Sequence, residues 1–184
     1  MYGVLGEDDS DVETLKVLIR RLAKQDRLPV RGKGFDGGAK LLRKGASALR
    51  TLSSLGCKRF VVCHDADGHD PSERLQSVRE EIIKRAEVPG ESCIVIPVQE
   101  LEAWILADVA AVTNIFTGWT PGSVSNPEGI AKAKEYLEKL SRAGLSRPRY
   151  SHATHNARVA DYLDLGIVHQ KCPSFRPLAA FVGS

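Results

Sequence analysis

The first hundred residues alternate between short apolar runs and segments with helically spaced apolar positions. Four runs have the length of strands buried on both faces of a sheet. They lie at residues 2–6, 28–31, 58–64 and 92–98. Between them, apolar side chains recur every three or four positions, which predicts helices at about 10–22, 39–54 and 72–86. This alternation favours an α/β fold with a mostly parallel sheet, flanking helices and right-handed crossovers.

After residue 98 the pattern becomes helical. Helical spacing predicts helices at 101–112, 130–143, 156–165 and 174–182, while residues 117–127 are rich in Gly, Pro, Ser and Thr and predict a loop. No internal repeat is visible. We therefore expect an α/β core at residues 1–110 and a C-terminal helical extension at residues 111–184 that packs on the core.

Composition places the chain among ordinary globular proteins. Of its 184 residues, 42% are hydrophobic and 27% are charged, so disordered and fibrous classes are excluded. No apolar run approaches the roughly 18 residues of a membrane span, and the first residues lack the basic region of a signal peptide. Four cysteines form no CxxC pair. We expect a cytoplasmic protein with reduced, structural cysteines, no zinc site and no membrane partner.

Charge is unevenly distributed although the net charge is only +3. Residues 16–50 hold eleven Lys or Arg against two acids, and residues 111–184 hold nine against five. The acids gather at 7–13, 65–73 and 100–108. Acid clusters framed by basic surface suit a polyanion held near a cation. The alternative is that these Lys and Arg residues form solvated helix faces.

Carboxylates follow three of the predicted strands. The set comprises Glu7 and Asp11 after the first strand, Asp65 and Asp67 after the third, and Glu100 and Glu102 after the fourth. Because the carboxyl ends of parallel strands share one edge, these side chains should converge there. Like charges held together need a cation, and Mg²⁺ or Mn²⁺ fits carboxylate oxygens. The alternative for any single acid is a helix cap.

The Asp65-Ala66-Asp67 spacing adds to this prediction. On an extended chain, residues i and i+2 point the same way, so both carboxylates would face one metal ion. Turns are also rich in Asp, so the position after an apolar strand is what distinguishes this pair.

A glycine-rich segment and a basic segment are candidates for contacting a polyanion. Residues 32–37 match G-x-G-x-x-G, but the acid that a dinucleotide fold needs is missing from residues 51–60. We instead expect a turn that brings Lys33 to the edge of the sheet, near phosphate. Arg147, Arg149 and Tyr150 would contact phosphate and a base, by charge and by stacking. An ordinary basic loop is the alternative.

Together these residues resemble the Toprim (topoisomerase–primase) superfamily. In that family a Glu ends the first strand and an Asp-x-Asp pair ends the third, as Glu7 and Asp65-Ala66-Asp67 do here. Residues 6–11 are similar to the Glu-Gly-x-Ser/Thr-Glu signature of the branch with the OLD (overcoming lysogenization defect) nucleases, with Asp8 in place of Gly and Asp11 in place of the second Glu. Residues 100–108 and 150–175 resemble small stand-alone Toprim-like proteins.

The resemblance implies a Mg²⁺- or Mn²⁺-dependent nuclease, a hydrolase that cleaves DNA or RNA. Its metal ligands would be Glu7, Asp11, Asp65 and Asp67, with Glu100 or Glu102 completing a second metal site. Its catalytic residues would be Glu7, Asp65, Asp67 and His152, the last standing where the family has Lys. Such proteins are often encoded beside ATPases in phage-defence loci, so the resemblance also implies an ATPase partner.

Three alternatives stay open. The first is a Toprim-shaped binding subunit of an ATPase complex without catalysis. The second is a response-regulator receiver domain, which residues 4–12 also resemble and in which Asp65 would accept phosphate. A receiver needs a hydroxyl residue after its fourth strand, and residues 97–100 have none. The third is a phosphatase whose nucleophile is an Asp-x-Asp motif.

Overall fold

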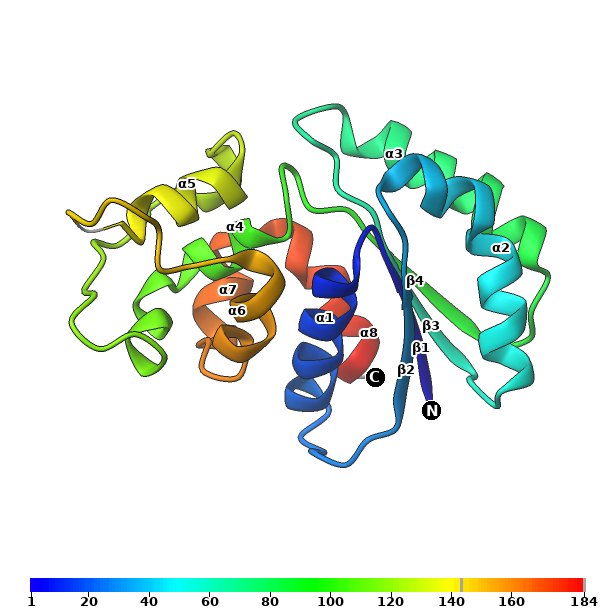
Figure 1. Cartoon of the computed structure of the whole chain (residues 1–184). Helices are drawn as coiled ribbons and strands as arrows, with labels where there is room; N and C mark the ends of the chain where they lie inside the picture. Colours follow the sequence, from blue (N-terminus) through cyan, green and yellow to red (C-terminus); the bar gives the residue numbers. More distant parts are fainter. Residues whose placement is uncertain (143, 184) are drawn as a thin grey trace.

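A four-stranded, all-parallel sheet forms the centre of the protein. The computed structural model describes residues 1–142 and 144–183. The strands are β1 (Tyr2–Gly6), β2 (Val30–Gly34), β3 (Arg59–Cys63) and β4 (Glu91–Val95), in the order β2-β1-β3-β4 (Figure 1). This confirms the predicted α/β fold. The loops after β1, β3 and β4 leave the same edge of the sheet, where the predicted carboxylates lie.

Strand β2 differs from its prediction. It begins at Val30 and runs through Gly34, whereas the sequence analysis placed a strand at 28–31 and a turn at the glycines. The glycines serve close packing: a Cβ on Gly32 would stand 2.3 Å from Val12 Cγ1, and one on Gly34 would stand 2.5 Å from the Asp8 carbonyl carbon. They let the start of the first helix lie directly against the strand.

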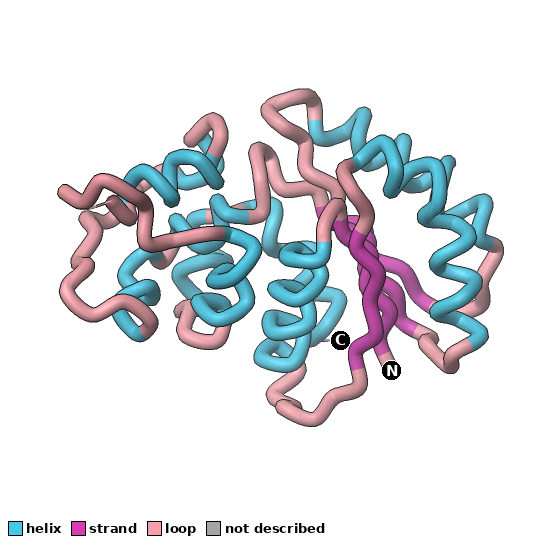
Figure 2. Tube along the Cα trace, viewed as in Figure 1, coloured by secondary structure: helices cyan, strands magenta, loops and turns pink. Residues whose placement is uncertain are grey.

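Helices cover both faces of the sheet (Figure 2). One face carries α1 (Asp9–Leu22); the other carries α2 (Gly38–Ser54) and α3 (Pro71–Val78). Helix α3 continues into the π-helical segment η1 (Arg79–Lys84). The predicted helix at 72–86 is therefore present, but its second half is a π-helix. Each helical layer has its own apolar core against the sheet.

The C-terminal part is helical, as predicted, with different boundaries. Its elements are α4 (Glu102–Ala107), η2 (Val109–Asn114), η3 (Pro127–Gly129), α5 (Ala133–Leu140), α6 (His152–Ala160), α7 (Leu165–Lys171), η4 (Pro173–Phe175) and α8 (Arg176–Gly183). The predicted helix 101–112 is interrupted at Asp108, whose φ of −123° and ψ of 59° are not helical. Helix α7 was not predicted. The predicted ends at residues 143 and 184 lie outside the described residues.

The helical part shares one apolar core with the α1 face of the sheet. Val4 of β1, Leu15 of α1, Trp104 of α4 and Leu178 of α8 belong to the same buried cluster. The indole N–H of Trp104 donates to Ser174 Oγ at 2.9 Å, which satisfies its polar atom inside the core. The extension therefore packs on the core over a continuous apolar surface.

The cysteines are buried, free thiols, as the sequence analysis expected: Cys57, Cys63, Cys93 and Cys172. No helix in the described part of the chain is long and apolar enough to cross a membrane.

Candidate functional site

The loop between β1 and α1 is folded around two aspartates. Asp8 is the N-cap of α1, and its carboxylate accepts a hydrogen bond from the Asp11 backbone N–H at 2.9 Å. Asp11 Oδ2 in turn accepts from the backbone N–H groups of Glu7 and Asp8, at 3.0 and 3.2 Å. The two aspartates thus form a reciprocal capping box, the helix-cap role that the sequence analysis gave as the alternative for a single acid. Asp11 is thus both a structural cap and a buried carboxylate.

Glu7 ends β1 and is held by donors from the neighbouring strand. Its Oε1 lies 2.7 Å from His64 Nδ1 and accepts from the Asp65 backbone N–H at 2.8 Å. Burial alone would raise the pKa of Glu7, but His64 and the backbone N–H groups of Asp65 and Gly38 outweigh burial and lower it. Glu7 is therefore held as a carboxylate in a fixed orientation.

Asp65, directly after β3, has the opposite environment. Its side chain is buried, with the residue only 8% exposed, and its Oδ1 has no hydrogen-bond partner within the described structure. Burial raises its pKa well above the usual value, and the nearby charges of Asp11, Glu7, Glu102 and Asp67 raise it further. Burial also raises the pKa of Asp11, to about 8, with contributions from Asp8 and Glu102. The cluster thus disfavours negative charge on these two carboxyls.

Asp67 lies at the exposed end of the same segment, but its backbone is not extended. Its φ is 51°, in the left-handed region, and its N–H donates to the Gln99 carbonyl at 3.0 Å within a turn. The prediction that Asp65 and Asp67 point the same way from an extended chain is therefore wrong. Asp67 remains close enough for its charge to act on Asp65.

Glu102 and Glu100 reach the cluster from the segment after β4. Glu102 is 1% exposed, and its Oε1 accepts from Asn156 Nδ2 at 2.9 Å. Asn156 Oδ1 accepts from the Tyr150 hydroxyl, so a buried chain of hydrogen bonds supports Glu102. Burial raises the pKa of Glu102, with the charge of Lys134 opposing it. Glu100 instead caps α5, because its Oε2 accepts from the Lys134 backbone N–H at 2.8 Å.

Lys134 is a site residue that the sequence analysis missed. Burial alone would lower its pKa, but the charges of Glu102, Glu100, Asp8 and Asp11 outweigh burial and raise it. Its ammonium group forms no ion pair within 4 Å among the described residues, so it faces the carboxylates at longer range. In the sequence it is one of several Lys residues near the start of an amphipathic helix, which is typical of a solvated face.

Asn156 was missed as well, although its position carried a signal. It shares the buried stripe of α6 with Val159 and Ala160, at the spacing of a helix face that packs inward. A buried amide on such a stripe needs hydrogen-bond partners, which here are Glu102 and Tyr150.

Several predicted site residues make contacts other than with the carboxylates. His152 starts α6; its Nδ1 lies 3.4 Å from Glu138 Oε1, and its carbonyl accepts from Ser10 Oγ at 3.0 Å, at the start of α1. Lys33 is exposed and borders a hollow between β2 and α2. Arg149 donates to the Thr117 carbonyl at 3.3 Å, while Arg147 is exposed.

Tyr150 requires a correction to its predicted role. It is 2% exposed and its hydroxyl is used inside the core, so its ring is not available to stack on a base. Its contribution is to support Glu102 from within the protein.

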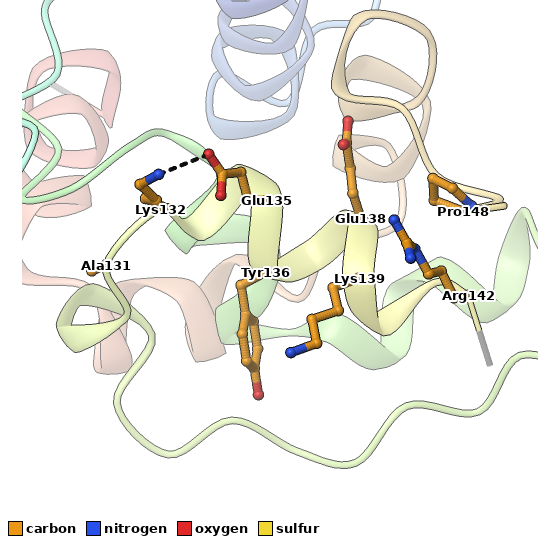
Figure 3. A pocket seen from close by; sticks show the side chains of 8 residues that line it. All are labelled: Ala131, Lys132, Glu135, Tyr136, Glu138, Lys139, Arg142 and Pro148. Carbon is orange, nitrogen blue, oxygen red and sulfur yellow. Dashed lines mark hydrogen bonds and ion pairs between the residues drawn. The ribbon is translucent and has the colours of Figure 1, made fainter. Parts of the chain in front are cut away.

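A hollow of about 470 Å³ lies along α5, the helix that carries Lys134. Figure 3 shows Lys132 paired with Glu135, whereas Tyr136 and Lys139 extend from another side of the helix. Arg142 stands near Glu138 and Pro148 at the end of the helix. In the described structure, neither Lys139 nor Arg142 takes part in an ion pair. This hollow offers two cations and an exposed aromatic ring on α5.

The edge of the sheet carries carboxylate oxygens, the ligands that a hard cation prefers, but their spacing is not that of a complete metal site. Across residues 1–142 and 144–183, no group of three or more His, Cys, Asp or Glu side chains has an arrangement that could hold a metal ion as it stands. The orphaned Oδ1 of Asp65 nevertheless lies buried amid other carboxylates, where a cation would stabilise it.

Comparisons with known proteins identify a family. No curated protein and no solved structure matches the chain. One family model, described as "Domain of unknown function (DUF4276)", matches residues 6–182, a range that includes every carboxylate of the edge together with Lys134 and Asn156. The chain therefore belongs to the DUF4276 family.

Proposed function

We propose that the protein is a Mg²⁺- or Mn²⁺-dependent phosphodiesterase of the Toprim type that cleaves nucleic acid. The observation that carries this proposal is the buried, unpartnered Oδ1 of Asp65, with Glu7, Asp11 and Glu102 close enough for their charges to raise its pKa. A cluster of this kind is stabilised when a divalent cation replaces the missing positive charge. The 2-1-3-4 parallel sheet delivers these side chains to one edge.

Each carboxylate has its own part in the proposed site. Glu7 is held ionised by His64 and by the Asp65 backbone N–H, so it is a ready ligand. Asp65 would hold the cation as well, because a positive charge there would offset the like charges that raise its pKa. The exposed Asp67 would offer a further carboxylate oxygen. When bound, the metal ion supplies an activated water and neutralises charge on the scissile phosphate.

The surface of α5 and the segment after it suits a polyanionic substrate. Lys139 of α5, with Arg142 and the exposed Arg147 after the helix, offers cations on this surface. Tyr136 is 38% exposed in the same hollow and takes the stacking role first assigned to Tyr150. An ATPase partner and a place in phage defence remain part of the proposal, carried by the Toprim resemblance alone.

A cleavage assay tests the proposal. Supercoiled plasmid, linear duplex and single strands of DNA and RNA are incubated with the protein and Mg²⁺, Mn²⁺ or EDTA. We expect cleavage only with a divalent cation, and a loss of at least about a hundredfold in Glu7→Gln and Asp65→Asn. Glu81→Gln changes a partly exposed glutamate of η1 that is paired with Arg85; it is the matched control and should cleave as the wild type does.

The same variants separate the proposal from the alternatives. Metal binding without cleavage of any substrate, with or without a partner, would favour the silent binding subunit. Acid-labile phosphorylation of Asp65 by a small phosphodonor would favour the receiver. Against the receiver, the described chain after β4 contains helices and loops, and the sheet ends at four strands.

A further inference from the structure

We propose that the free edge of β2, together with the hollow between β2 and α2, docks an extended acidic segment of a partner protein, which adds to the sheet as a further strand. This inference goes beyond the proposed function, because it depends on neither a metal ion nor cleavage. It gives Lys33 a peptide carboxylate as its partner, in place of the phosphate that the sequence analysis expected.

The backbone of β2 is open along one side. The sheet order β2-β1-β3-β4 leaves the strand at the edge, paired with β1 alone (Figure 1). The Tyr2 backbone N–H donates to the Pro29 carbonyl, and alternate residues of a strand address opposite sides, so Val30 and Gly32 direct their N–H and C=O groups outward. Those of Gly32 have no partner within the described structure. Edge groups of this kind pair with an added strand.

The two faces of β2 differ. Cβ atoms placed on Gly32 and Gly34 would lie against α1 and the loop before it, so the strand is closely packed on that face. Arg31 and Lys33 alternate with these glycines and point to the opposite face, that of α2, where both are exposed. An added strand would therefore meet a packed helix on one face and two cations on the other.

A hollow of about 560 Å³ lies on the α2 face of this edge. Its lining from α2 and the C-cap of that helix comes from positions 44, 47, 48, 51, 52 and 55, which is the spacing of one helix face. Phe35 and Leu52 are buried residues of its lining, and Leu55, 48% exposed, adds apolar surface that is open to solvent. Side chains of an added strand that point to this face would bury apolar area against these residues.

Charge complementarity selects an acidic segment. Lys44 of α2 borders the same hollow, and neither it nor Arg31 or Lys33 forms an ion pair in the described parts of the chain. Asp36, which lies near the two lysines, is already paired with Lys40. Carboxylates of a partner would supply the negative charge that this surface lacks.

Two other occupants fit this surface less well. Antiparallel pairing of β2 with the β2 strand of a second copy, centred on Gly32, would set Arg31 opposite Lys33, and like charges directly opposite each other destabilise a strand pair. A nucleic acid would use the same cations, but its backbone has no N–H groups to pair with the carbonyl of Gly32. A peptide uses the cations, the apolar lining and the strand edge together.

Fluorescence anisotropy with labelled ten-residue peptides tests the inference. Each peptide has blocked ends and carries Glu and Val in turn on one face of an extended strand and Thr on the other; a counterpart carries Lys in place of Glu. We expect the acidic peptide to bind the full chain at least about tenfold more tightly than the basic one. The double variant Lys33→Glu/Lys44→Glu should reverse this preference. Arg43→Glu changes an exposed cation beside Lys44 that does not line the hollow, and it should bind as the wild type does.

The apolar lining has its own matched pair. Leu55→Gln should weaken binding of the acidic peptide, because it removes apolar surface from the hollow. Leu145→Gln changes a leucine that is equally exposed, at 48%, but lies outside this hollow, and it should leave binding unchanged.

Strand pairing leaves a signature that charge alone does not. Two further acidic peptides carry N-methyl groups on alternate residues, in opposite phases. Only one phase faces β2, so one peptide should lose binding and the other should keep it. In hydrogen-exchange NMR, the unmodified acidic peptide should slow exchange of the Gly32 amide by at least about tenfold and leave β4, at the opposite edge of the sheet, unchanged.

The remaining outcomes would overturn the inference. They are no binding of the acidic peptide up to about 1 mM, or binding that both N-methyl phases affect equally without protection of Gly32. Binding of a labelled oligonucleotide but not of the peptide, lost in Lys33→Glu/Lys44→Glu, would assign the surface to nucleic acid. A wild-type dimer in analytical ultracentrifugation that Leu55→Gln dissociates would assign it to a second copy.

Discussion

Glu7 and Asp65 follow two neighbouring strands and are joined by a hydrogen bond, yet they have opposite surroundings. The Asp65 backbone N–H donates to Glu7 Oε1 at 2.8 Å, and His64 lies against the same oxygen, so the pKa of Glu7 is lowered despite burial. Asp65 donates its backbone N–H to Glu7, but its own Oδ1 receives no hydrogen bond. Burial and the like charges nearby raise the pKa of Asp65. The difference shows that two neighbouring carboxylates can differ in what the protein gives them. Glu7 has its hydrogen-bond partners within the protein, whereas Asp65 needs a partner that the protein does not supply.

The largest expected effect is on the pH dependence of stability without metal. The pKa of Asp11 is about 8 in the folded protein and close to its ordinary value of 3.8 when unfolded, so between these values the folded state holds a proton that the unfolded state has lost. The free energy of unfolding should therefore fall as pH rises from about 4 to 8, by up to about 1.4 kcal/mol per pH unit for each such group. Urea unfolding in EDTA at several pH values measures this slope.

Two controls sharpen that measurement. Asp11→Asn keeps an oxygen that can accept the capping hydrogen bonds and should flatten the slope, because it removes the titrating group. Saturating Mg²⁺ should flatten it in the wild type. A slope that is unchanged in both would mean that these carboxyls ionise in the folded protein as easily as in water.

The second prediction contrasts the two carboxylates directly. In EDTA near pH 8, Glu7→Gln should lower the free energy of unfolding by about 2–3 kcal/mol, because the charged acceptor of His64 and of the Asp65 backbone N–H is lost. Asp65→Asn should leave stability unchanged or raise it, because a neutral amide relieves the like-charge repulsion. Urea denaturation of both variants gives the comparison. Equal losses of unfolding free energy in the two variants would contradict this difference between Glu7 and Asp65.

The third prediction concerns the close packing of Gly34, at the end of β2, against the loop between β1 and α1. A Cβ on Gly34 would meet the backbone of Asp8 and Asp9 at 2.5 Å, so Gly34→Ala should push the β1–α1 loop away and destabilise the protein by about 1–3 kcal/mol. Gly122→Ala is the control, because nothing lies within 4 Å of its Cβ position. Thermal unfolding compares the two, and an equal shift of the melting temperature in both would argue against close packing at Gly34.

The smallest expected effect concerns the support of Glu102. Tyr150→Phe removes the hydroxyl that donates to Asn156 and should lower the free energy of unfolding by about 1 kcal/mol. Binding of single-stranded nucleic acid should be unchanged, since the ring is buried. Fluorescence anisotropy with a labelled oligonucleotide checks this, and a marked loss of affinity would restore Tyr150 to the binding surface.

The sequence predicted the sheet better than the helices around it. A short continuous apolar run such as residues 60–63 is typical of a strand buried on both faces. Three of the four strands lie close to their predicted positions. Strand β2 was misplaced because its glycines resemble a turn when the helix that packs on them is unknown. Helix ends after residue 98 were less accurate, because tertiary packing decides them.

The candidate site was partly predictable for a similar reason. Carboxylates that follow strands can be found from local pattern, because topology alone brings them together. Lys134 and Asn156 could not be placed this way, since they join the site through helix packing across 34 and 54 residues from Glu100 and Glu102. The backbone of Asp67 was mispredicted because an Asp in a turn readily adopts left-handed angles.

The hydrogen bond between Asn156 and Glu102 also constrains how the protein can be made. A ribosome synthesises the chain from its N-terminus, so every acid of the edge is present before Lys134 and Asn156 exist. Ser10 and Arg21 of α1 likewise form their hydrogen bonds only after their acceptors, the carbonyls of His152 and Ala160, have been synthesised. The cluster of carboxylates is therefore incomplete until residue 156 has been synthesised, and it is completed only when α5 and α6 pack against the sheet.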